Sequence, residues 1–129
     1  MTERTTTAGV AVKDGKYLVA QRMPGGPLSE KWEFVGGKNR WGETIEDTLK
    51  REWMEELSLP IEVGEYLTET EFENKGVHYT LKCHMVKPLS DEFKLNVHQS
   101  VQWVTKDELQ SLSFGDSDSV ILDYLVKNL

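Results

Sequence analysis

The chain has 129 residues, of which 38% are hydrophobic and 29% are charged, and this is the balance of a globular protein with a real core. Its net charge of −7 at pH 7 disfavours nucleic acid as a partner, because nothing in the composition supplies a basic surface. Its one cysteine, Cys83, excludes an intramolecular disulfide, and no apolar run is long enough to cross a membrane. We therefore expect a single domain over residues 1–129, located in the cytoplasm and independent of membranes.

The first third of the chain predicts short strands and one long loop. Thr5–Val12 is rich in threonine and valine, which is typical of a strand. Asp14-Gly15 predicts a hairpin turn that leads into a second strand at Lys16–Gln21. Met23–Lys31 contains two glycines and two prolines, so we expect a loop long enough to fold over a ligand. A short strand is expected at Trp32–Phe34.

The central stretch Val35–Leu59 (VGGKNRWGETIEDTLKREWMEELSL) predicts a glycine turn, a polar loop and then a helix. Thr44 is placed to cap this helix together with Asp47. Ser58 is expected to end the helix, and Pro60 prevents its continuation. Apolar residues recur every fourth position and give one stripe for packing, made of Ile45, Leu49, Trp53 and Leu57.

Three glutamates, Glu52, Glu55 and Glu56, are neighbours in the last turns of this helix. Two ionised carboxylates at this spacing repel by roughly 3 kcal/mol at an effective dielectric constant of about 20, and the helix dipole also disfavours negative charge there. Placing like charges where they repel one another breaks the usual rules of helix stability, and such a break is typical of a functional site. A set of oxygen-rich carboxylate ligands suits Mg²⁺ or Mn²⁺ rather than zinc. The alternative is a solvated acidic face on which Arg51 pairs with Glu55.

The spacing G-x5-E-x7-R-E-x2-E-E resembles the Nudix box of the Nudix hydrolase family, with fixed positions at Gly37, Glu43, Arg51, Glu52, Glu55 and Glu56. Leu18–Arg22 (LVAQR) and Trp32–Lys38 (WEFVGGK) are similar to the MutT-type branch of that family, the nucleoside triphosphate pyrophosphohydrolases. The chain departs from the family pattern at Ser58, where a glycine is usual, and at Trp53, where a smaller aliphatic residue is usual.

The resemblance implies roles for the residues of the box. The family binds metal through helix carboxylates and through the carbonyl before the box glycine, and the matching groups here are Glu52, Glu55, Glu56 and the carbonyl of Gly36. Glu52 is the first choice as general base through a bound water. Arg51 is expected to orient a carboxylate by a bidentate hydrogen bond, Glu43 to brace the loop, and Trp41 to shield or pack it.

The resemblance also implies a nucleotide site beside the box. Arg22 is expected to contact phosphate, its alternative being a surface cation. Glu33 and Phe34 match positions that line the nucleoside pocket, although strand alternation lets only one of them face it. Hydrogen bonds to a base edge are expected from the start of the last helix, at Asp116, Ser117 or Asp118, where helix capping is the competing role.

After Pro60, apolar and polar residues alternate again, as they do in the strands of a sheet. Ile61–Glu73 and Val77–Val86 predict a long antiparallel pair, and Val101–Val104 a short strand. Thr105 and Glu108 fit a capping box for a brief helix. A terminal helix is expected to begin at Ser117 or Asp118, with an apolar face made of Val120, Ile121, Tyr124 and Leu125.

One late position departs from the MutT-like pattern. Many such enzymes carry a glutamate before His-Gln, where it helps to bind metal or to activate water, and Val97 precedes His98-Gln99 here. If this alignment holds, the helix carboxylates have to take over the metal binding or water activation of the missing glutamate. Alternatively, a carboxylate of the preceding loop, Asp91 or Glu92, substitutes for it.

The resemblance implies an α/β fold, the Nudix-type α/β/α sandwich, with a mixed central sheet between the box helix and the last helix. The expected activity is Mg²⁺-dependent (or Mn²⁺-dependent) hydrolysis of a nucleoside triphosphate to the monophosphate and pyrophosphate, with oxidised or noncanonical dNTPs among the plausible substrates. The expected partner is a small-molecule nucleotide, and the chain is expected to be a monomer or homodimer. Two alternatives remain: a Nudix hydrolase of another substituted nucleoside diphosphate (ADP-ribose, a sugar nucleotide or an RNA 5′ end), and a non-catalytic nucleotide sensor.

Overall fold

The computed structural model describes residues 2–129. The strands and helices are β1 (Thr2–Val10), β2 (Val12–Lys13), β3 (Lys16–Arg22), β4 (Trp32–Glu33), α1 (Ile45–Leu57), β5 (Ile61–Asn74), β6 (Val77–Pro88), β7 (His98–Val104), α2 (Lys106–Ser111) and α3 (Asp116–Asn128). Among these residues, no helix combines the length and the apolar character that a bilayer crossing requires.

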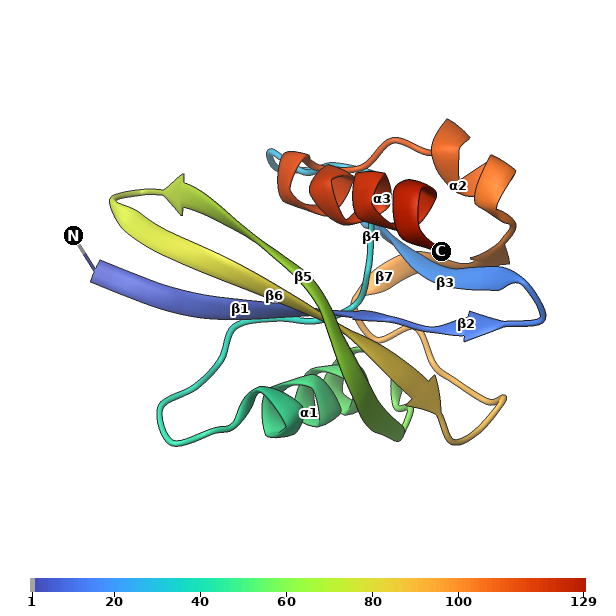
Figure 1. Cartoon of the computed structure of the whole chain (residues 1–129), viewed down its shortest axis with the longest axis horizontal. Coiled ribbons are helices and arrows are strands. Elements are labelled where there is room, and N and C mark those ends of the chain that lie inside the picture. Colours follow the sequence, from blue (N-terminus) through green and yellow to red (C-terminus); the bar gives the residue numbers. More distant parts are fainter. Residues whose placement is uncertain (1) are drawn as a thin grey trace.

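The strands form two sheets between two layers of helix. One sheet is mixed and has the order β1-β6-β5, in which β1 and β6 run parallel. In the other sheet β3 pairs with β2, β4 and β7, always antiparallel. Helices α1 and α3 cover opposite sides of this assembly (Figure 1). The predicted α/β/α class with a mixed sheet is confirmed, while the strands divide into two sheets rather than forming one.

The hydrophobic core has two parts, one on each side of the strands. Leu67, Leu81, Ile121 and Leu125 belong to the part beneath α3, and Val35, Leu49, Trp53 and Leu57 to the part beneath α1. Strand β3 contributes to both parts, because neighbouring residues of a strand point to opposite faces. Its Val19 packs on the α3 side, and its Leu18 and Ala20 pack on the α1 side.

Helix α1 has the caps and the buried stripe that its sequence predicts. The Thr44 side chain accepts a hydrogen bond from the Asp47 backbone N–H at 3.0 Å. Ser58 ends the helix in the left-handed conformation with φ of 52°. Trp53 is fully buried, and its indole N–H donates to the Val35 carbonyl at 2.9 Å, which ties the helix to the segment that precedes it.

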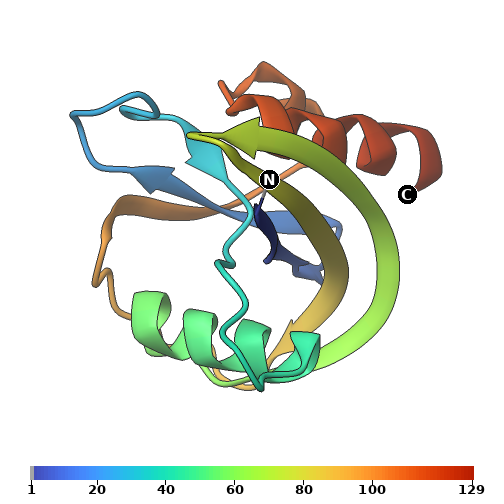
Figure 2. The same cartoon turned by 90° about the vertical axis from the view of Figure 1, so that its left-hand side faces the viewer.

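That segment runs antiparallel to β1 and delivers the glycines to the site. The Gly9 N–H donates to the Val35 carbonyl at 2.8 Å, the Thr7 N–H to the Gly37 carbonyl at 2.9 Å, and the Asn39 N–H to the Thr5 carbonyl at 2.9 Å. Figure 2 shows this stretch descending from β4 to α1 beside the curved β5–β6 pair.

The remaining elements confirm some predictions and correct others. The capping box of Thr105 and Glu108 is present at the start of α2. Strand β7 begins at His98 rather than at Val101, because polar residues at its start pair with β3. Helix α3 begins at Asp116, one or two residues earlier than predicted, and Val120 on its predicted apolar face is exposed. Trp41, which is expected to shield or pack the loop, is fully exposed and therefore does not pack it.

Candidate active site

An open cleft of about 560 Å³ brings together side chains from both sheets, α1 and α3. Eight of the predicted site residues line it, namely Arg22, Glu33, Phe34, Gly36, Glu52, Glu55, Glu56 and Asp118. Two predicted residues lie outside the lining. Arg51 lies behind the carboxylates, and Asp116 is exposed at the first position of α3, whereas Ser117 lines the cleft.

The glycines place the backbone against the carboxylates of α1. A methyl group on Gly37 would overlap the Glu52 carboxylate, and a methyl group on Gly36 would overlap the backbone of Thr7. The Thr7 backbone cannot give way, so only glycine fits at position 36, whereas a side chain at position 37 would displace the Glu52 carboxylate. The carbonyls of Val35 and Gly37 are bonded to β1, and Gly36 between them lines the cleft.

Arg51 holds the box together from behind. Its Nε and Nη2 donate to the two Glu43 carboxylate oxygens at 2.7 and 3.0 Å, and its Nη1 donates to Glu52 Oε1 at 2.7 Å. Its Nη2 also donates to the Lys38 carbonyl at 2.9 Å. These bonds lower the pKa of Glu43 to about 2 and raise that of Arg51. The bidentate partner of Arg51 is therefore Glu43, and Glu52 receives one further bond.

Glu56 lies deepest among the three helix carboxylates and is charged only at a cost. Burial, with help from the nearby Glu33 and Glu52, raises the pKa of Glu56 to about 9. Its Oε2 is buried and has no hydrogen-bond partner within residues 2–129. A buried, unpaired carboxylate oxygen is costly unless a cation or a proton joins it.

The donor chemistry of this end of the cleft fits a divalent cation. Glu52, Glu55, Glu56 and the Gly36 carbonyl offer only oxygen atoms, which Mg²⁺ and Mn²⁺ prefer. Glu33, Glu56 and His98 also place one possible ligand atom each within 4.8 Å of one another.

The other end of the cleft combines aromatic and polar groups. Phe34 stacks on Phe114 with ring centroids 5.3 Å apart, and its backbone N–H donates to Asp118 Oδ1 at 3.2 Å. Burial, with a smaller effect of Glu33, raises the pKa of Asp118 to about 7. Glu33 and Phe34 both contribute to the lining of the cleft, β4 ends at Glu33, and the Phe34 residue is buried.

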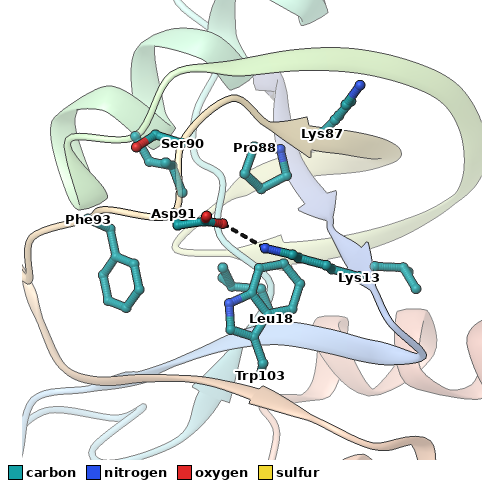
Figure 3. A pocket seen from close by; sticks show the side chains of 10 residues that line it. Lys13, Leu18, Lys87, Pro88, Ser90, Asp91, Phe93 and Trp103 are labelled. Atoms are coloured by element: carbon teal, nitrogen blue, oxygen red, sulfur yellow. Dashed lines mark hydrogen bonds and ion pairs between the residues drawn. The ribbon is translucent and has the colours of Figure 1, made fainter.

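The loop before β7 supplies no carboxylate to the cleft. Val97 lines the cleft with an apolar side chain. Asp91, a predicted substitute, pairs instead with Lys13 at 2.6 Å on the rim of a separate cavity of about 260 Å³ (Figure 3). Leu18, Phe93 and Trp103 are among the residues lining that cavity, and of the residues considered for the site it contains only Asp91.

His98 lies at the site, although no sequence pattern predicts a role for it. It is buried behind the cleft, with its Nε2 at 2.8 Å from Glu33 Oε2 and 3.7 Å from Glu56 Oε1. Its partners lie far away in the chain, so the only sequence signal was its place beside Val97.

Together, the paired glycines, the Arg51-braced carboxylates and the α/β/α frame define a hydrolase of the Nudix family. Residues 3–125 match the family described as the NUDIX domain, and the chain belongs to this family. Within it, the chain is a MutT-type Nudix hydrolase. Like other Nudix hydrolases, it uses a divalent cation.

Two curated relatives cover most of the chain. The chain is 30% identical over 116 residues to the CTP pyrophosphohydrolase of Escherichia coli (strain K12), a match that spans 90% of this chain and 86% of that one. It is 33% identical over 121 residues to the putative 8-oxo-dGTP diphosphatase 2 of Mycobacterium tuberculosis (strain H37Rv), which covers 92% and 84%.

Solved structures share the fold over nearly the whole length. The solution structure of the E. coli ORF135 protein superposes with a TM-score of 0.83 at 29% identity, over 98% of this chain and 91% of that chain. The crystal structure of a MutT NUDIX hydrolase from Burkholderia pseudomallei gives a TM-score of 0.84 at 23% identity, over 97% and 99%.

Proposed function

We propose that the protein hydrolyses a nucleoside triphosphate to the monophosphate and pyrophosphate. The observation that carries this proposal is the two-ended cleft, with carboxylates at one end and the Phe34–Asp118 pair at the other. A nucleoside triphosphate likewise has charged phosphates at one end, for the carboxylates and their cation, and an aromatic base at the other, for Phe34 and Asp118. The names of the relatives, CTP pyrophosphohydrolase, 8-oxo-dGTP diphosphatase and nucleoside triphosphatase NudI, support this class of substrate.

In this proposal Mg²⁺, with Mn²⁺ as a substitute, is held by Glu52, Glu55, Glu56 and the Gly36 carbonyl. When bound, such an ion neutralises phosphate charge and makes water a better nucleophile. Arg51 maintains the geometry of these ligands, because it bonds Glu52 while it is fixed by Glu43.

The side chains around the ion carry out the proton and phosphate chemistry. Glu52 is the proposed general base, since its carboxylate faces the cleft beside Gly37 and only one of its oxygens is held by Arg51. Arg22, whose side chain is half exposed at the cleft, is proposed to move from Glu33 to a substrate phosphate.

The nucleoside end is proposed to read the base. Phe34 provides an aromatic edge, and Glu33 and Asp118 provide carboxyl groups for a base edge. Asp118 with a pKa of about 7 is able either to donate or to accept a hydrogen bond near neutral pH. Asp116 remains a weaker proposal, since it lies outside the lining. Substrates with an altered base, such as oxidised dNTPs, are proposed on the same grounds.

The test is a Mg²⁺-dependent turnover screen on CTP, dGTP, 8-oxo-dGTP, ADP-ribose, a sugar nucleotide and triphosphorylated RNA. Pyrophosphate and orthophosphate are assayed separately, so that the bond that breaks is identified. The expected result is pyrophosphate release from a nucleoside triphosphate, reduced at least about a hundredfold in Glu52→Gln. Glu46→Gln is the matched control, because Glu46 lies exposed on the same helix.

Other outcomes overturn parts of the proposal. Turnover of ADP-ribose or RNA alone would contradict the substrate class and keep the chemistry of the box. Tight nucleotide binding without turnover, in both the wild type and Glu52→Gln, would indicate a sensor.

We also propose that the enzyme acts in the cytoplasm as a monomer or homodimer. The single cysteine, Cys83, is buried and free, which suits a reducing compartment. Size-exclusion chromatography with light scattering measures the oligomeric state, and a mass above that of a dimer would contradict this proposal.

A further inference from the structure

His98 is a buried polar residue that lies between two carboxylates of the cleft. It is the first residue of β7 and is opposite Arg22 of β3, where the register of the pair shifts between Gln21 and Arg22. Its side chain is 2% exposed, whereas the Arg22 side chain is 48% exposed. The ring is therefore enclosed by its surroundings, whereas the Arg22 guanidinium is half exposed to solvent.

The Glu33 carboxylate is held from both sides. Its Oε2 lies 2.8 Å from His98 Nε2, and its Oε1 lies 3.2 Å from Arg22 Nη1. An ion pair with a half-exposed arginine contributes little to fixing a side chain, because solvent competes for both partners. The buried imidazole is the stronger restraint on Glu33.

The hydrogen-bond geometry assigns the proton of the ring to Nε2. His98 Nδ1 is buried and has no partner within the described part of the chain. An ionised carboxylate accepts hydrogen bonds and donates none, so the nitrogen that faces Glu33, Nε2, is the one that carries the proton. That N–H donates to Glu33, since the 3.7 Å separation from Glu56 Oε1 is too long for a hydrogen bond.

We propose that His98 is a positioning residue: it fixes the carboxylate of Glu33 toward the nucleotide and holds it apart from Glu56. The inference rests on the proposed function, because it requires Glu33 to contact the substrate. When a phosphate draws Arg22 away, His98 keeps Glu33 in place. Glu56 then remains available to the cation, and Glu33 remains available to the base.

The kinetic experiment compares three variants on CTP and 8-oxo-dGTP with Mg²⁺. His98→Leu removes the donor, His98→Gln keeps an N–H near the place of Nε2, and His84→Leu is the control at a half-buried histidine of β6 outside the cleft. His98→Leu is expected to raise KM about tenfold with little change in kcat, the factor that one hydrogen bond is worth. His98→Gln is expected to recover most of the loss, and His84→Leu to match the wild type.

A second readout does not depend on activity. Long-range ¹H–¹⁵N spectra of the histidine rings are expected to show His98 with its proton on Nε2, and Glu33→Ala is expected to shift that nitrogen. If no nucleotide is turned over, the proposed function fails, and these spectra alone decide the pairing. The inference would be overturned by an unchanged KM in His98→Leu, or by a His98→Gln variant that is as impaired as His98→Leu. It would also be overturned if Glu33→Ala left the His98 nitrogen signal unshifted.

Discussion

Arg51 is the residue on which the internal hydrogen bonds of the box converge. It bonds both oxygens of Glu43, one oxygen of Glu52 and the Lys38 carbonyl. Arg51→Lys keeps the charge but loses the planar fork, so we expect the free energy of unfolding to fall by about 2 kcal/mol and turnover to fall with it. Urea denaturation measures the first effect. Lys50→Ala, which breaks only an exposed pair with Glu46, is the control and is expected to change stability by less than about 0.5 kcal/mol.

Glu56 makes the stability of the metal-free protein depend on pH. Its pKa is raised from 4.5 to about 9, so between these values the folded chain binds a proton that the unfolded chain has released. Stability therefore falls as pH rises through this window. In the presence of a chelator, Glu56→Gln is expected to be more stable than the wild type by on the order of 2 kcal/mol near pH 8, and by almost nothing near pH 4. Thermal unfolding against pH measures the difference, and parallel profiles for the two proteins would contradict it.

At the scale of the element, the end of α1 carries backbone strain that a glycine would remove. Ser58 has φ of 52°, which costs roughly 1 kcal/mol for a residue with a side chain. Ser58→Gly also loses the hydrogen bond from Asn96 Nδ2 to Ser58 Oγ. We expect a net gain of about 0.5 kcal/mol in the free energy of unfolding, measured by chemical denaturation. Ser58→Ala keeps the strain and loses the hydroxyl, so it is expected to be less stable than the wild type. A destabilised Ser58→Gly would show that the hydroxyl matters more than the strain.

Elements built by local rules were predictable, and those built by distant contacts were not. Helix α1 was found with its caps, because Thr44, Asp47 and Ser58 act within one turn of the helix ends. The start of β7 was missed, because it depends on pairing with β3, nearly eighty residues earlier. The family spacing placed the carboxylates on one cleft, but the bond between His98 and Glu33 spans 65 positions and follows from no local pattern.

At the scale of the whole molecule, the two parts of the core share their strands. Cys83 of β6 packs on the α3 side, and Val86 of the same strand packs on the α1 side. We therefore expect residues 1–129 to unfold as one domain in a single transition. Tryptophan fluorescence, to which the buried Trp53 contributes, and far-UV circular dichroism are expected to give the same midpoint in urea. Separate midpoints would contradict the prediction of a single domain.

Because Trp41 is fully exposed, it is an intrinsic fluorescence probe of the loop of the box. The chain has four tryptophans, of which Trp53 is fully buried, while Trp41 stands fully in solvent between the glycines and α1. A dissolved collisional quencher such as iodide meets the Trp41 indole more readily than the Trp53 indole. Iodide therefore quenches Trp41 in preference to the buried Trp53, and a molecule that covers the loop of the box would reduce the quenching of Trp41.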